Sequence, residues 1–297
     1  MYTIVTASQK GGSGKTTLSG HLAVEADRAG AGPVALVDTD PQGSLAMWWN
    51  ARQAPTPHFV KSGLTDLGQT LAQLAASGFR LTVIDTPPAI TSSISHVVAY
   101  ADLVIVPTRP SPHDLRAVGA TVDIAERHHK PLVFVLNEAT ARARITGESA
   151  VALSQHGTVA PVTLHHRVDY AASMIDGRTV QEVVPNSASA REVAELWLYI
   201  QAKLSRLVRD PSLIPDFQPE HFAINALLED AEPEEDEDDT ALPPKPIVEP
   251  PPLVSTYTGP ERRMNPPGTR YAGPERRAVA FGRRRVEVPL FIDEGRK

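Results

Sequence analysis

The residues best suited to chemistry lie in one short segment near the start of the chain, Gln9-Lys-Gly-Gly-Ser-Gly-Lys-Thr-Thr17. This segment follows an apolar run and precedes a helix-forming stretch, which is the setting of a phosphate-binding loop. Its glycines allow the backbone to turn tightly and to point N–H groups at phosphate oxygens, and the following helix adds its positive end. Lys15 is suited to contact the β- and γ-phosphates of a nucleotide, and the Thr16 hydroxyl to bind Mg²⁺.

Two carboxylates follow apolar runs further along the chain. Asp38 lies in Val37-Asp-Thr-Asp-Pro-Gln-Gly43, and Asp85 ends the run Leu81-Thr-Val-Ile-Asp85. We expect both at the ends of adjacent strands. There they would hold Mg²⁺ mostly through water molecules, because this ion keeps much of its hydration shell. The predicted metal-binding residues are therefore Thr16, Asp38 and Asp85.

The elements that must position these side chains alternate along the chain. Predicted strands are Thr3–Ala7, Val34–Val37, Leu81–Ile84, Leu103–Val106, Leu132–Leu136 and, more weakly, Val159–Val162. Predicted helices are Lys15–Ala29, Leu64–Ala76, Ser93–Tyr100, Ser111–Arg127 and Gly147–Gln155. Runs that are apolar throughout suit strands covered on both faces. Strand–helix alternation then predicts an α/β fold with a doubly wound, mostly parallel sheet.

Aromatic residues mark two further features. A last helix is predicted over Ala188–Leu207, where Trp197 and Ile200 belong to an apolar stripe at helical spacing. We expect this helix to pack against the sheet. The pair Trp48-Trp49 is interpreted as core or interface packing rather than as a platform for a nucleotide base.

Composition divides the 297 residues into two domains, a globular domain over 1–208 and a tail over 209–297. The tail holds 15 of the 27 prolines and has 12 Lys and Arg against 18 Asp and Glu, which accounts for the whole net charge of −6. The chain has no cysteine, which excludes disulfides, thiolate metal sites and cysteine nucleophiles. No run approaches the ~18 apolar residues of a membrane span, so we expect no transmembrane segment and a cytoplasmic protein.

The tail is predicted to be disordered, because so polar and charged a segment cannot bury enough apolar surface to offset its ordering entropy. It contains an acidic run, Glu229–Asp239, and a proline-rich stretch, Pro243–Pro252. Two copies of Tyr-x-Gly-Pro-Glu-Arg-Arg follow, at Tyr257–Arg263 and Tyr271–Arg277. Linked weak sites gain avidity, so the repeats are interpreted as a docking motif for another protein. A solvated linker is the alternative.

Taken together, the motifs resemble those of the ParA/MinD family of ATPases. The loop has Gln9 in place of the first glycine of the usual phosphate-binding pattern and a second lysine, Lys10, beside it, as in the family's deviant Walker A loop. Val37–Gly43 and Leu81–Pro88 resemble its second motif and its Walker B strand, and Val104–Pro107 with Phe134–Asn137 fits two later strands. The resemblance spans residues 1–207. It implies a P-loop NTPase fold, ATP and Mg²⁺ as cofactors, and ATP hydrolysis.

The resemblance also implies roles for individual residues. Asp40 would orient the attacking water, and Asn137 would contact the adenine amine. Lys10 would reach the phosphates of a partner subunit, so that hydrolysis is tied to an ATP-dependent homodimer. The predicted catalytic residues are thus Lys10, Lys15 and Asp40. The predicted nucleotide-binding residues are Gly11, Gly12, Ser13, Gly14, Lys15, Thr16, Thr17 and Asn137.

Small ParA proteins position DNA or protein cargo on the nucleoid, and this chain resembles them most. Such relatives bind DNA without sequence preference through late basic residues, for which Arg167, Arg178 and Arg191 are the candidates. Only phosphate contacts are expected, so binding would depend strongly on salt. The resemblance also implies an activating partner protein and association with the nucleoid.

Two other functions remain open at this point. One is an ATP-switched scaffold or regulator at a membrane or cell pole that does not bind DNA. The other is an ATP-dependent ligase of the dethiobiotin or cobyrinic acid type, against which Lys10 and Asp38-Thr-Asp-Pro-Gln42 argue. The missing cysteines exclude a nitrogenase-reductase relative. Val286–Ile292 is too short and proline-broken for the membrane-targeting helix of MinD-like members.

Overall fold

The computed structural model describes residues 1–88 and 91–207. The strands of this part are β1 (Tyr2–Thr6), β2 (Val34–Asp38), β3 (His58–Lys61), β4 (Leu81–Asp85), β5 (Leu103–Thr108), β6 (Leu132–Leu136) and β7 (Thr158–Val159). The longer helices are α1 (Lys15–Arg28), α2 (Ser44–Ala51), α3 (Leu67–Ala76), α4 (Thr91–Ala99), α5 (Pro112–Arg127), α6 (Arg144–Ser154) and α9 (Ala188–Leu204). Shorter turns of helix are α7 (Val168–Ser173), η1 (Met174–Asp176) and α8 (Val180–Val183). The predicted tail and its repeats lie outside the described residues.

The described strands form one parallel sheet in the order β3-β2-β4-β1-β5-β6-β7. The predicted doubly wound α/β class is confirmed. Within the sheet, Asp85 pairs in register with Thr6 on one side and with Asp38 on the other. The carboxyl ends of the central strands therefore meet at one edge. This edge is where an open α/β sheet binds its ligand.

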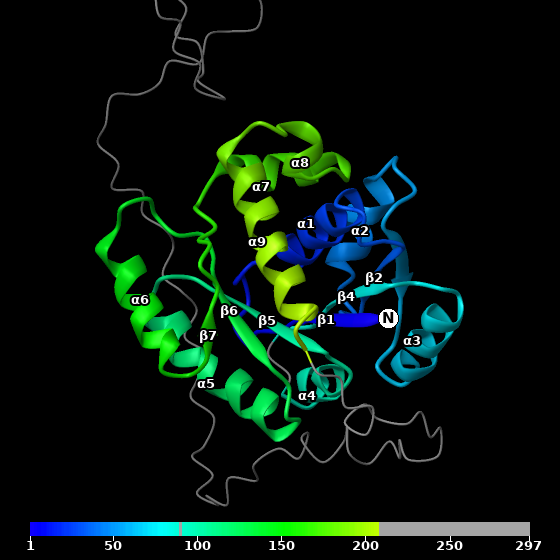
Figure 1. Cartoon of the computed structure of the whole chain (residues 1–297), viewed down its shortest axis with the longest axis horizontal. Helices are drawn as coiled ribbons and strands as arrows, with labels where there is room; N and C mark the ends of the chain where they lie inside the picture. Colours follow the sequence, from blue (N-terminus) through cyan, green and yellow to red (C-terminus); the bar gives the residue numbers. More distant parts are fainter. Residues whose placement is uncertain (89–90, 208–297) are drawn as a thin grey trace, which may run out of the picture. The chain divides into compact units, whose positions relative to one another are not determined.

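Helices cover both faces of the sheet (Figure 1). One buried cluster joins α1, α2 and α9 to one face, and a second joins α3, α4, α5 and α6 to the other. Because both faces are covered, the central strands are buried along their whole length, which explains their continuous apolar runs. Among the described helices, none is long and apolar enough to cross a membrane.

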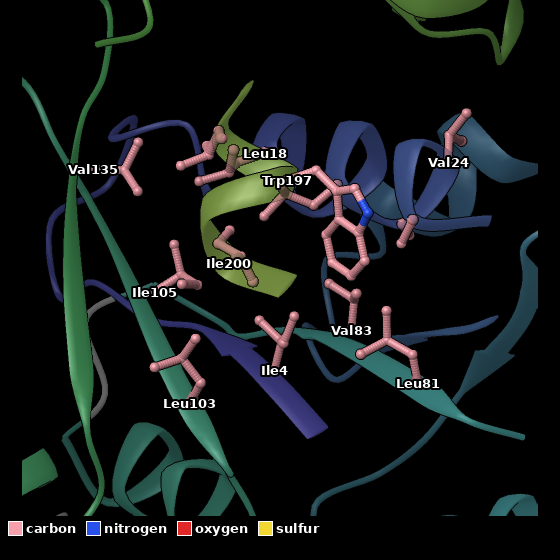
Figure 2. Packing of buried hydrophobic residues seen from close by; sticks show 14 of the residues in the cluster. Ile4, Leu18, Val24, Leu81, Val83, Leu103, Ile105, Val135, Trp197 and Ile200 are labelled. Carbon is pink, nitrogen blue, oxygen red and sulfur yellow. The ribbon is translucent and has the colours of Figure 1, made fainter. Parts of the chain in front are cut away.

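Helix α9 packs against the sheet as predicted, although it ends at Leu204 rather than Leu207. Figure 2 shows Trp197 and Ile200 pointing from α9 toward Ile4 and Val83 of the sheet. Trp197 is 1% exposed and Ile200 is fully buried. Helical spacing places both on one face, so this stripe fixes α9 beside α1.

The structure adds short elements that the sequence did not reveal, among them α2, β3 and α8, and shortens a predicted strand. Helix α2 and strand β3 were not predicted; β3 lies at the edge of the sheet and is not fully buried, so it lacks a continuous apolar run. Strand β7 covers Thr158–Val159 only, not the predicted Val159–Val162, because Pro161 has no N–H to extend the ladder. Trp48 is 6% exposed and belongs to the core cluster, which confirms its packing role.

Candidate functional site

The predicted phosphate-binding loop connects β1 to α1 at the carboxyl edge of the sheet. Two of its glycines, Gly12 and Gly14, have φ values of +72° and +93°, a left-handed conformation that favours glycine. Gly14 precedes α1, and its carbonyl accepts the first helical hydrogen bond from the Leu18 N–H. Gly11 and Gly12 are exposed, so the crown of the loop is open to a ligand.

Lys15 begins α1 and points back into the loop. Its Nζ donates a 3.2 Å hydrogen bond to the Ser8 carbonyl, and the residue is only 7% exposed. Burial lowers the pKa of Lys15, and the negative charges of Asp85 and Asp40 act in the opposite direction. The loop thus encloses a largely desolvated amine at the point where the sequence predicts phosphates.

Asp85 joins the loop to the end of β4. Its Oδ2 accepts a 2.7 Å hydrogen bond from the Thr16 hydroxyl, and its Oδ1 accepts a 3.1 Å bond from Ser19. Burial raises the pKa of Asp85 to about 6, and the nearby charge of Asp38 adds to this, whereas the Thr16 and Ser19 hydrogen bonds and Lys15 oppose it. Burial makes this carboxylate costly to ionise, and a bound cation would stabilise its charged form.

Asp38 and Asp40 shape the segment that follows β2. Asp38 Oδ1 accepts from the Asp40 N–H and its Oδ2 from the Ala46 N–H, both at 3.0 Å. Burial raises the pKa of Asp38, while these backbone bonds lower it. Asp40 accepts from the Gln42 N–H at 2.9 Å and is 9% exposed. The Asp38 carboxylate therefore fastens the first turn of α2 to the sheet edge.

These residues fit a Mg²⁺ ion. The Thr16 hydroxyl and the Asp38 and Asp85 carboxylates are hard oxygen donors, the kind that Mg²⁺ prefers, and two of them are in direct contact. Within the described residues there is no group of three or more His, Cys, Asp or Glu side chains that could hold a metal by itself. Nucleotide and water oxygens would have to complete the coordination, as is usual for this ion.

Asn137 follows β6 and reaches the loop from the other side. Its Nδ2 donates a 2.8 Å hydrogen bond to the Ser13 carbonyl. A methyl group on Gly14 would lie 2.2 Å from this nitrogen, so the approach requires glycine there. The Asn137 side chain therefore links the strand end to the loop backbone.

A pocket of about 160 Å³ opens beside Asn137 and the first turn of α1. Its lining includes Gly14, Thr17, His21, Asn137, His165 and Tyr170. His21 and Tyr170 stack edge to face with ring centroids 5.4 Å apart, and burial lowers the pKa of His21 to about 4, which leaves a neutral ring. Sequence reasoning missed this wall, because Tyr170 and His165 follow no motif and only the fold brings them to the loop.

The three candidate DNA-contacting arginines differ in their surroundings. Arg167 lines the pocket and donates a 2.7 Å hydrogen bond to Glu192, which also binds His165. Arg178 and Arg191 are exposed; Arg178 pairs with Asp176 at 2.6 Å, and Arg191 donates to the Asn186 carbonyl. Arg178 and Arg191 thus lie on the open surface, and Arg167 belongs to the pocket wall.

Lys10 is partly exposed at the crown of the loop, and its backbone N–H donates to Ser8 Oγ at 3.3 Å. The role predicted for Lys10 concerns the nucleotide of a second subunit. Of the predicted site residues, the structure brings Lys15, Thr16, Asp38, Asp40 and Asp85 together at the sheet edge, with Asn137 on the opposite flank of the loop.

Comparison with known proteins gives consistent matches. A family model described as the CobQ/CobB/MinD/ParA nucleotide binding domain matches residues 4–180. The "Maintenance of carboxysome distribution protein A" of Halothiobacillus neapolitanus is 30% identical over 201 residues, which cover 64% of this chain and 92% of that protein.

Two solved structures match most of the described chain. An ATP complex of a McdA variant from Cyanothece has a TM-score of 0.55 at 17% identity and covers 70% of this chain and 99% of that one. MinD of Pyrococcus horikoshii with Mg-ADP has a TM-score of 0.57 at 14% identity, over 69% and 99%. These likenesses confirm the fold.

Proposed function

The chain belongs to the CobQ/CobB/MinD/ParA family of nucleotide-binding domains, and from this premise we propose that it is a Mg²⁺-dependent ATPase that positions a cargo. The observation that carries the proposal is the contact between Thr16 and Asp85 at 2.7 Å beside the buried Lys15. A hydroxyl, a desolvated carboxylate and a desolvated amine at the start of a helix are what a metal-bound triphosphate needs. Matches to solved ATP and Mg-ADP complexes of relatives support the choice of ligand.

The chain's own side chains would divide the work as follows. The loop N–H groups and Lys15 bind the phosphates, and Asn137 borders the pocket in which the adenine would lie. Thr16, Asp38 and Asp85 would hold Mg²⁺, which supplies neutralisation of phosphate charge. Asp40 would orient the attacking water, because a carboxylate beside a phosphate can hold water but is a weak base.

We further propose that the ATP-bound form is a homodimer in which Lys10 contacts the partner's nucleotide. Its partly exposed position at the open crown of the loop supports this role. Coupling hydrolysis to dimerisation makes the protein a switch, monomeric with ADP and dimeric with ATP, that an activating partner protein can reset.

The family name covers metabolic enzymes as well as positioning proteins, so membership alone does not choose between them. The relative from Halothiobacillus neapolitanus, 92% of whose length is matched by this chain, is a carboxysome distribution protein, and this favours positioning. Exposed Arg178 and Arg191 offer cations for phosphate contacts with DNA and support association with the nucleoid. The proposed cargo is DNA or a protein assembly. The second candidate function is a scaffold that switches with ATP and does not bind DNA.

The test is retention of non-specific duplex DNA with ATP and Mg²⁺ or with ADP, at two salt concentrations. Positioning on DNA predicts binding with ATP only, weaker at higher salt, and further weakened by Arg191→Ala but not by Arg116→Ala, an exposed control on α5. Phosphate release measured in the same samples reports hydrolysis. Hydrolysis without DNA retention in either state would favour the scaffold, and no hydrolysis would reject the ATPase.

The two tail repeats are proposed to dock another protein, and they lie outside the described residues. Deleting residues 210–297 should leave the basal ATPase rate unchanged while abolishing capture of that protein. Loss of folding on deletion would show instead that the tail belongs to the ATPase domain.

A further inference from the structure

Arg109 lies at the phosphate-binding loop without belonging to any motif. It follows the last residue of β5, and β5 pairs with β1, which leads into the loop. A methyl group placed on Gly12 would lie 4.0 Å from Arg109 Nη1, and within the described part of the chain no other atom beyond its neighbours comes as near. The guanidinium therefore faces the exposed crown of the loop.

The orientation of Arg109 is fixed by Asp114 in the first turn of α5. Arg109 Nε donates a 3.1 Å hydrogen bond to Asp114 Oδ1. Asp114 is 4% exposed, and its other oxygen accepts from the Ser111 hydroxyl at 2.5 Å, while its own N–H donates to Ser111 Oγ. A buried, doubly anchored carboxylate is a rigid support for the base of the guanidinium.

The Nη groups of the Arg109 guanidinium make weaker contacts than its Nε. Its Nη1 lies 3.8 Å from Glu138 Oε2, beyond hydrogen-bond distance, and the Arg109 and Glu138 side chains are 32% and 40% exposed. Among the described residues, the Nε contact is the one hydrogen bond that the Arg109 side chain makes. The two Nη groups thus remain available for a bidentate ligand such as a phosphate.

We propose, resting on the ATPase function above, that Arg109 is a further nucleotide-contacting residue, which binds the polyphosphate of the same chain through its Nη groups. Asp114 is its positioning residue. An incoming triphosphate carries more negative charge than Glu138 and would compete with it for the Nη groups, while the Nε bond to Asp114 is kept. A third cation, supplied in cis, would then join Lys15 and the partner's Lys10 at the phosphates.

The test compares ribose-labelled fluorescent ATP and AMP in titrations of the full chain. Arg109→Ala should lower ATP affinity about 10- to 100-fold and leave AMP affinity within about 2-fold, because AMP lacks the outer phosphates. Arg116→Ala, exposed on α5, should change neither. An unchanged ratio of ATP affinity to AMP affinity in Arg109→Ala would overturn the proposal. If both affinities fall equally, the loop has collapsed; if neither changes, Arg109 does not contact the nucleotide.

Asp114 is tested with a double-mutant cycle. Asp114→Asn should lower the ratio of ATP affinity to AMP affinity in the wild-type background and have no further effect in Arg109→Ala. An effect of the same size in both backgrounds would assign Asp114 to helix capping alone. If Arg109→Ala does not fold, Arg109→Gln keeps a donor for Asp114 and removes the charge, and it should show the same loss. Wild-type protein that binds neither nucleotide would reject the ATPase function itself, whereas wild-type binding with unaffected variants rejects only Arg109.

Discussion

Thr16 and Asp85 are 69 residues apart in the chain, and their side chains meet in a 2.7 Å hydrogen bond. The contact fastens the first turn of α1 to the end of β4 and leaves the Asp85 carboxylate 1% exposed. In the protein without ligand, this position holds a charge that its surroundings disfavour, because burial raises the pKa of Asp85 to about 6. The site is therefore under electrostatic strain that a cation would remove.

Asp85→Asn should stabilise the ligand-free protein and abolish hydrolysis. The pKa of Asp85 lies at about 6 in the folded state against an ordinary value of 3.8. Its stabilising contribution is therefore complete below pH 3.8 and is lost as the pH rises through 6. Above that pH the neutral asparagine avoids the cost of a buried charge, a gain of order 1–3 kcal/mol.

The measurement is thermal unfolding of Asp85→Asn and wild type at pH 8 and at pH 5. The difference in Tm should be large at pH 8 and smaller at pH 5. Asp123→Asn, at an exposed position on α5, should match wild type at both. A variant that is less stable than wild type at pH 8 would contradict the electrostatic account.

Lys10→Ala should abolish ATP-dependent dimerisation and lower hydrolysis by at least about 100-fold while leaving monomer binding of ATP intact. Lys10 lies at the open crown of the loop, and its hydrogen bond to another described residue is made by its backbone N–H, which leaves the side chain to act across an interface. Sedimentation with ATP and Mg²⁺ measures the dimer. A variant that still dimerises and hydrolyses ATP would refute the role across the interface.

Gly14→Ala should impair nucleotide binding, and Gly119→Ala should not. A Cβ on Gly14 would meet Asn137 Nδ2 at 2.2 Å, and the φ of +93° is unfavourable for alanine. Gly119 lies in α5 with nothing within 4 Å of an added Cβ, so alanine there should stabilise the helix by up to about 1 kcal/mol. Titration with ATP and thermal unfolding check both, and equal ATP affinities would show that the loop tolerates the substitution.

Arg52→Ala should destabilise the fold by about 2–3 kcal/mol, because it leaves the largely buried Glu182 carboxylate with only its Thr179 hydrogen bonds. Both Arg52 Nη groups donate to the Glu182 carboxylate at 2.8 and 2.9 Å, and the Arg52 side chain is 3% exposed. Burial alone would raise the pKa of Glu182, but the contacts with Arg52 and Thr179 together outweigh it and hold the pKa below its ordinary value. This stabilisation should be lost as the pH falls below 4.5.

The contrast for Arg52 is Arg178→Ala. Arg178 pairs with Asp176 at 2.6 Å, but both side chains are about half exposed, and surface pairs contribute little. Urea unfolding should therefore show a large loss for Arg52→Ala and no measurable change for Arg178→Ala. Equal effects in the two variants would contradict the burial argument.

Much of the site was predictable because its motifs are local. A short glycine pattern precedes Lys15 and Thr16, and an apolar strand ends at Asp38 and another at Asp85. A few neighbouring residues are therefore enough to identify each position. Helix α2 and strand β3 gave weaker signals, since α2 begins after Gly43 with only eight residues and β3 lies half-covered at an edge. Arg109 and Tyr170 carried no pattern at all.

The sequence by itself determined the parallel α/β sheet, the phosphate-binding loop and the family, because strand burial and tight glycine turns are encoded by neighbouring residues. The tertiary structure decided which distant side chains share the site. Thr16 against Asp85, Asn137 against Ser13, and Arg52 against Glu182 meet only because parallel strands bring their following loops to one edge and because α2 packs against η1, next to α8. Such contacts depend on side-chain position in three dimensions, which no local periodicity records.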